Sequence, residues 1–146
     1  MNKKGFTLVE LLATMVILAI ISAVAIPNVL KIMTNNKKER IINDGLVLIS
    51  QAKKIVSSDY DLRNELNDTG KNYTLQVLDK YGDLVLDPDG KEYERDQSYV
   101  KISKENGVIL YCVILKSEKW TLKNNSSCVL EKELLGDNSK DYVKEI

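Results

Sequence analysis

One carboxylate stands in an unusual position near the start of this sequence. Glu10 is the single charged residue in an apolar run of 21 residues, from 6 to 26. A carboxylate inside a membrane-length segment is costly and is functional by default, which calls for a cation at the same depth. The alternative is that Glu10 lies one turn from the membrane edge and extends its side chain to water.

The rest of the sequence offers little chemistry of the enzymatic kind. Its 146 residues include no histidine, which excludes His-based triads, imidazole bases and His-ligated metals. We find no nucleophile motif and no phosphate-binding loop. We therefore expect a protein that is not an enzyme and that uses no cofactor or metal. The 21 basic and 21 acidic residues balance, and no basic run is concentrated after residue 60, which argues against nucleic acid as a partner.

The apolar run is long enough to cross a membrane as a helix, since about 20 residues span a hydrocarbon core of roughly 30 Å. A secretory signal peptide is the alternative, with a possible cleavage site at 22–25, but its apolar region covers only about 7–15 residues. Basic residues stand on both sides of the run, so the positive-inside rule gives no orientation. These residues are Lys3, Lys4, Lys31, Lys37, Lys38 and Arg40.

Residues 3–12 read KKGFTLVELL and resemble the class III leader of type IV prepilins and pseudopilins. In that family a short basic leader ends in Gly, and a membrane-embedded prepilin peptidase cuts after it and methylates the new N-terminal residue. The fifth residue after the cut is Glu. The resemblance implies a leader over 1–5, cleavage between Gly5 and Phe6, N-methylation of Phe6, and a role for Glu10 in assembly.

The resemblance also implies a function. The family's Glu pairs with the N-terminal amine of a neighbouring subunit, and two unit charges ~4 Å apart interact by roughly 4 kcal/mol at an effective dielectric of 20. Pro27 occupies a position at which many pilins carry Pro, and it is expected to matter for assembly. The chain would be a structural subunit of a type IV pilus or pilus-like extracellular filament. Alternatives are a pseudopilin of a type II secretion or competence system, or a minor pilin with an adhesive or binding head.

The implied partners and location follow from this function. The partners are other pilin subunits, the prepilin peptidase, a membrane assembly platform and, before assembly, the lipid bilayer. The precursor would be a single-pass protein of the cytoplasmic membrane with its N-terminus inside. The mature protein would reach an extracellular pilus or a periplasmic or cell-wall pseudopilus.

The elements that position these residues begin with one long helix. We expect it to run from 6 to 60, with a transmembrane or filament-core half over 6–26 and an amphipathic half over 27–60. Pro27 predicts a kink or local break between them. A membrane anchor joined to a soluble domain is the alternative arrangement. The stripe that defines the amphipathic half consists of Ile42, Leu46, Ile49, Ala52, Val56 and Tyr60.

The remaining residues, 61–146, are expected to form a β-rich head with a loosely held C-terminal tail from 131. The fold class is α+β and pilin-like, with an antiparallel sheet of three to five strands that packs one face on the long helix. Strands are predicted at 73–78, 84–86, 98–103, 108–115 and 120–123, with a loop at 61–72 and turns at 87–90 and 104–107. The run at 108–115 is apolar on both faces and should be the central strand.

The head contains both cysteines, Cys112 and Cys128. Export to an oxidising compartment favours a disulfide, and their spacing resembles the C-terminal disulfide loop of many type IV pilins. Two buried free thiols are the alternative. The turn at 87–90, with Tyr93, resembles a DP-x-G-x-x-Y segment of major pseudopilins, although Asp89 stands where Trp is common. We interpret it mainly as a turn, with too few ligands for calcium.

Overall fold

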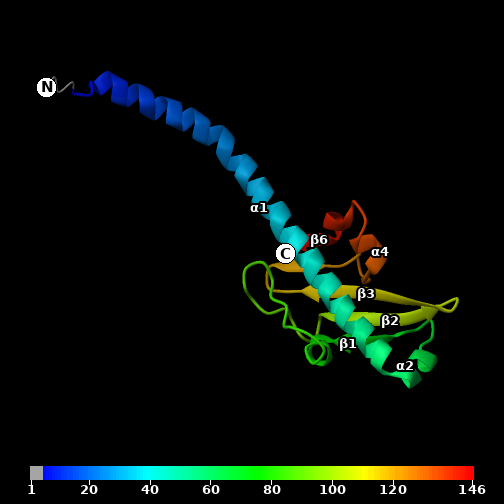
Figure 1. Cartoon of the computed structure of the whole chain (residues 1–146). Coiled ribbons are helices and arrows are strands. Elements are labelled where there is room, and N and C mark those ends of the chain that lie inside the picture. The colour runs from blue at the N-terminus through cyan, green and yellow to red at the C-terminus, as the bar shows by residue number, and fades with distance from the viewer. Residues whose placement is uncertain (1–4) are drawn as a thin grey trace. The chain divides into compact units, whose positions relative to one another are not determined.

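The structure is a computed structural model that describes residues 5–146 (Figure 1). The chain forms two compact units, Met1–Asn36 and Lys37–Ile146. Of the leader predicted over 1–5, residues 1–4 lie outside the described residues. The long helix α1 (Leu8–Ser58) begins in the first unit and ends in the second.

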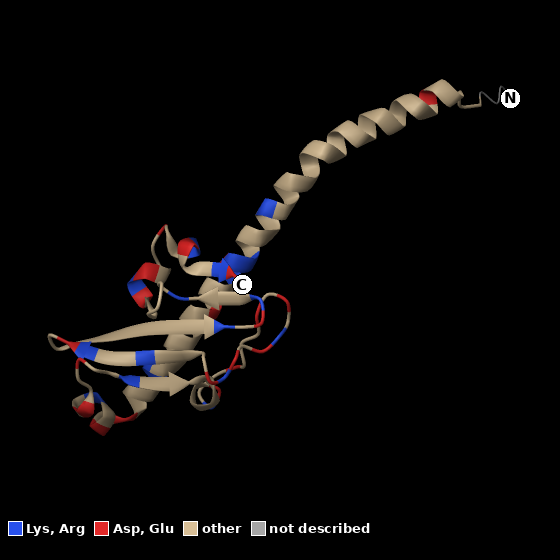
Figure 2. Ribbon diagram, turned by 180° about the vertical axis from the view of Figure 1, so that it is seen from behind, with Lys and Arg blue, Asp and Glu red and all other residues tan. Residues whose placement is uncertain are grey.

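The first unit is helical from Leu8 onward, and every residue from 8 to 34 is exposed. The helix contains an 18-residue window with a mean hydropathy of 2.6, of which none is buried, so by length and composition it could cross a membrane. Figure 2 shows this stretch almost free of charged residues. The local break predicted at Pro27 is absent, because α1 continues through it. Pro27 has no N–H to donate, so only one helical bond is lost there.

The second unit packs the later turns of α1 on one antiparallel sheet (Figure 1). The sheet has six strands in the order β1-β2-β3-β4-β6, with β5 also paired to β3. The α+β fold with a helix on a sheet is confirmed, although the sheet has one strand more than the largest number expected. The strand at 108–116 is central, as predicted. The strands are β1 (Lys71–Thr74), β2 (Tyr99–Glu105), β3 (Val108–Lys116), β4 (Trp120–Leu122), β5 (Val129–Leu130) and β6 (Val143–Glu145).

The core of this unit lies between α1 and one face of the sheet. In β2 the buried residues are Val100 and Ile102, which alternate with half-buried neighbours as a strand with one covered face requires. The predicted helical stripe is largely confirmed, but its last member, Tyr60, is 74% exposed. The buried residues of α1 are Ile41, Ile42, Gly45, Leu48, Ile49, Gln51, Ala52, Ile55 and Val56.

The segment after α1 differs from the predicted loop and strands. A short helix, α2 (Tyr60–Glu65), forms because the Asp59 carboxylate accepts a hydrogen bond of 3.0 Å from the backbone N–H of Leu62. The strand predicted at 73–78 ends at Thr74, and α3 (Leu75–Leu78) follows it. Leu75 and Leu78 are both buried, and a spacing of three suits a helix and not a strand. The strand predicted at 84–86 is only an isolated bridge to Glu92.

The C-terminal tail is firmly held, which corrects the expectation of a loose segment. It contains α4 (Glu131–Leu134), a 3-10 turn η1 (Ser139–Tyr142) and β6, which pairs with β4. Val143 is fully buried, and the backbone N–H of Ile146 donates to the carbonyl of Lys119 at 2.8 Å. The tail is therefore one edge of the sheet.

Candidate functional site

The first turn of α1 brings Glu10 into contact with Thr7. The carboxylate oxygen Oε2 of Glu10 accepts hydrogen bonds from the backbone N–H of Thr7 at 2.9 Å and from its hydroxyl at 3.0 Å. The backbone N–H of Glu10 in turn donates to the Thr7 hydroxyl at 3.3 Å. This reciprocal pattern is a capping box, in which a Thr at the N-cap and a Glu three residues later satisfy each other's free N–H groups. A negative charge in the first helical turn is also favoured by the helix dipole.

The predicted cleavage site lies beside this capping box. Gly5, Phe6, Thr7 and Glu10 together line an open hollow of about 440 Å³. Residues 5–7 are not part of the helix, and the Phe6 side chain is 83% exposed. The structure thus brings three of the predicted site residues together and adds Thr7. The pattern T-x-x-E was the sequence signal that could have identified Thr7.

Pro27 is not part of this cluster. It follows Glu10 by 17 residues in the same helix, which corresponds to roughly 25 Å along the helix axis at 1.5 Å per residue. Its surroundings are the exposed apolar residues of α1. An exposed apolar surface of this length is larger than a soluble monomer tolerates, so it requires lipid or other apolar helices as neighbours.

The two cysteines are joined. Cys112 lies in β3 and Cys128 directly precedes β5, with their Cα atoms 5.4 Å apart in a disulfide. The alternative of two free thiols does not hold. The bond encloses β4 and links two segments that also pair as strands, with Cys112 opposite Leu130.

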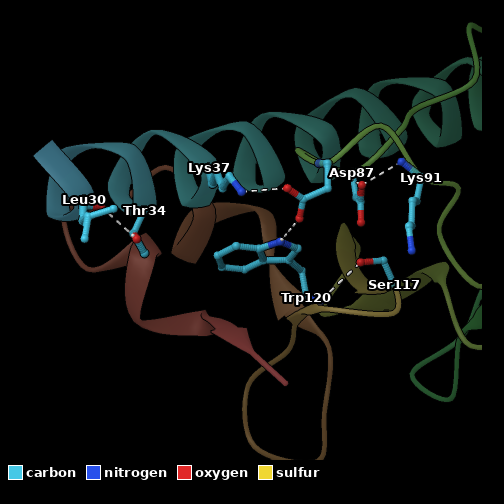
Figure 3. Close-up of polar contacts among 8 residues, drawn as sticks. Leu30, Thr34, Lys37, Asp87, Lys91, Ser117 and Trp120 are labelled. Atoms are coloured by element: carbon cyan, nitrogen blue, oxygen red, sulfur yellow. Dashed lines mark hydrogen bonds and ion pairs between the residues drawn. The ribbon is translucent and has the colours of Figure 1, made fainter.

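The turn at 87–90 connects three parts of the second unit. Its Gly90 has a φ of +81°, and the Asp87 carboxylate accepts the backbone N–H groups of Asp89 at 3.0 Å and Lys91 at 2.8 Å. Asp89 accepts hydrogen bonds from Lys37 Nζ at 2.7 Å and from the indole Nε1 of Trp120 at 3.1 Å. Figure 3 shows Lys37 and Trp120, with dashed lines that mark their polar contacts. These two donors lower the pKa of Asp89.

These contacts show what the turn does in the fold. Asp89 ties α1 to β4 through Lys37 and Trp120, and no local sequence pattern indicates this arrangement. Among residues 5–146, no group of three or more acidic, cysteine or histidine side chains is placed to hold a metal ion. The hydrogen bonds of Asp89 to Lys37 and Trp120 make the turn a cross-link between helix and sheet.

The N-terminal residues match a known protein family. Residues 1–26 match the family described as the prokaryotic N-terminal methylation motif, which is the class III signal peptide of type IV pilins and pseudopilins. No curated protein and no solved structure matches the chain. The motif belongs to structural proteins, and together with the apolar helix it fits a membrane-anchored precursor.

Proposed function

We propose that the chain is a structural subunit of a type IV pilus or a pilus-like extracellular filament. The observation that carries this proposal is the N-terminal methylation motif continuing into an exposed apolar helix, which is stable only in lipid or among helices of the same kind. In this proposal the prepilin peptidase cuts between Gly5 and Phe6 and methylates Phe6. The precursor is held in the cytoplasmic membrane with its N-terminus inside, and an assembly platform adds it to the filament.

Glu10 gives the filament its register in this proposal. Cleavage creates an amine at Phe6, and the Glu10 of a neighbouring subunit pairs with it within the apolar core. A carboxylate in such surroundings is destabilised until a cation reaches it, so docking at the correct depth is favoured over docking elsewhere. Pro27 leaves one carbonyl of the helix without its usual donor, which makes the helix easier to bend when subunits pack.

A pseudopilin role uses the same chemistry at the N-terminus. The chain would then build a short periplasmic or cell-wall pseudopilus of a type II secretion or competence system. The second unit, Lys37–Ile146, is the part that would differ between a filament subunit and a minor pilin with a binding head.

The test is to isolate the protein from cells with an intact assembly system. We expect intact-mass and N-terminal peptide analysis to find a chain that begins with methylated Phe6, and we expect this chain in the filament fraction sheared from the cells. A protein that retains its first five residues in such cells would contradict the proposal. A mature protein confined to the cell envelope would instead favour the pseudopilin role.

A further inference from the structure

We propose that Thr7 is a positioning residue for the cleavage step. Its capping contacts with Glu10 begin α1 after the scissile bond and keep that bond in open backbone, where a peptidase can bind it. The inference rests on the proposed function, because it assigns Thr7 a role in the same processing reaction.

The hydrogen bonds define the start of the helix. The backbone carbonyl of Thr7 accepts a bond of 3.2 Å from the N–H of Leu11, which makes it the first carbonyl of the helical ladder. The Thr7 hydroxyl accepts the N–H of Glu10 and the Glu10 carboxylate accepts the N–H of Thr7, so these two N–H groups are satisfied without residues 5 and 6.

The peptidase needs the peptide bond between Gly5 and Phe6 in open backbone, outside the helix. Water adds its oxygen to the carbonyl carbon of Gly5, the bond to the Phe6 nitrogen breaks, and that nitrogen keeps the electron pair and takes a proton relayed by the peptidase. The products are a carboxyl group on Gly5 and an amine on Phe6. If the helix began one turn earlier, the Gly5 carbonyl would accept the N–H of Val9, and the bond would lie inside a helical turn.

The described residues leave the scissile bond accessible. Apart from its chain neighbours, no atom of residues 5–146 would lie within 4 Å of a Cβ placed on Gly5, so packing in this part of the chain does not require glycine there. The space around Gly5 is therefore available to the peptidase, for which a residue without a side chain permits close approach. Phe6 is also exposed. The capping box thus separates a well-formed helix from an accessible substrate segment at a single residue.

The expected effect follows from the strength of an N-cap. Replacing an N-cap Thr by a residue without a capping oxygen shifts the equilibrium at a helix end by about fivefold, the equivalent of about 1 kcal/mol. Without the cap, chains whose helix begins upstream and takes in the scissile bond gain population, and we expect Thr7→Val to lower the rate of cleavage by up to about this factor. Valine keeps the shape of threonine and replaces only the hydroxyl with a methyl group.

The experiment compares four full-length variants with the unmodified chain, in membranes that contain an active prepilin peptidase. Thr7→Ser and Thr7→Asn restore a capping oxygen with side chains of different shape, and we expect both to be cleaved at close to the original rate. Thr14→Val is the matched control, because the Thr14 hydroxyl donates to the Leu11 carbonyl at 2.8 Å within the same helix and caps nothing. The rate is measured by the mass of the product over time.

The outcomes separate this inference from the proposed function. Slow cleavage of Thr7→Val alone among the variants supports the capping role. Normal cleavage of Thr7→Val would overturn it, as would rescue by Ser but not by Asn, which would mean that the peptidase reads the hydroxyl directly. Equal slowing by Thr14→Val would assign the effect to the helix in general. If the unmodified chain is not cut after Gly5, the proposed function itself fails.

Discussion

The phenol hydroxyl of Tyr93 donates a hydrogen bond of 2.7 Å to the carboxylate Oδ2 of Asp44, and so joins the loop before β2 to α1. Tyr93 is only 2% exposed. Burial raises the pKa of Asp44, which is the cost of keeping a carboxylate on the sheet-facing side of the helix. Burial and the nearby carboxylate also raise the pKa of Tyr93, so the phenol remains a donor.

Removing this donor should destabilise the second unit. We expect Tyr93→Phe to lower the free energy of unfolding by about 1–3 kcal/mol, because the half-buried Asp44 carboxylate loses a partner that water replaces poorly. Urea unfolding of the full chain in detergent measures this, with the fluorescence of the chain's one tryptophan, Trp120, as the probe. Tyr60→Phe is the control, since Tyr60 is 74% exposed. Equal stability of the two variants would contradict the role of the bond.

The dependence of stability on pH should distinguish two carboxylates. The donors Lys37 and Trp120 lower the pKa of Asp89 in the folded chain. The unfolded chain therefore binds more protons at Asp89 as the pH falls below about 4. The contribution of Asp89 to stability is complete above that pH and is lost as the pH falls through its lowered folded value. We expect Asp89→Asn to flatten the acid limb of the curve of unfolding free energy against pH.

Asp44 should act in the opposite sense. Because burial raises its folded pKa, the folded chain holds the proton longer than the unfolded chain, and stability falls as the pH rises through the folded value. We expect Asp44→Asn to remove this fall, so that stability rises more steeply with pH than in the unmodified chain. The two curves, measured by urea unfolding between acid and neutral pH, should diverge in opposite directions. A change of slope in the same direction would contradict one of the two assignments.

The disulfide should stabilise the second unit, which contains both cysteines. Cys112 and Cys128 are 16 residues apart, and closing a loop of this length contributes roughly 3 kcal/mol in the chain-entropy model. We expect the double variant Cys112→Ser, Cys128→Ser to unfold at a lower urea concentration by a corresponding amount. Reductant should lower the midpoint of the unmodified chain to that of the variant and leave the variant unchanged. A variant that responds to reductant would show that the effect is not due to this bond.

Local signals account for the parts of the fold that the sequence predicted. The hairpin between β2 and β3 was predicted because Asn106-Gly107 suits a turn in which both residues have positive φ, here 51° and 82°. The capping box also has a local signal, the pattern T-x-x-E at residues 7–10. The weak helix former Gly45 has a reason that only the structure provides. A Cβ there would approach Leu122 to 3.0 Å and Val113 to 3.2 Å, so glycine lets α1 lie close to the sheet.

The parts that were missed depend on contacts between distant residues. Lys37 and Asp89 are separated by 52 positions, and neither residue carries a local sign of the other. β6 is three residues long with one buried member, Val143, which is too short for alternation to be visible among its charged neighbours. The tail is held in place by the pairing of β6 with β4, which the composition of the tail does not indicate.

The last prediction separates the two roles of Glu10, which caps its own helix and is proposed to pair with a neighbour's amine. Glutamine at this position keeps the capping box, since its side-chain oxygen can still accept from Thr7, but it carries no charge. We therefore expect Glu10→Gln to be cleaved at close to the original rate and to assemble poorly into filaments.

Glu10→Ala loses the capping oxygen as well as the charge, and this variant should be cleaved somewhat more slowly and assemble equally poorly. Immunoblotting for the mature chain in cells and in the sheared filament fraction measures both steps. Abundant filaments from Glu10→Gln would show that the charge is not needed for assembly, whereas loss of cleavage in that variant would place the charge in the processing step.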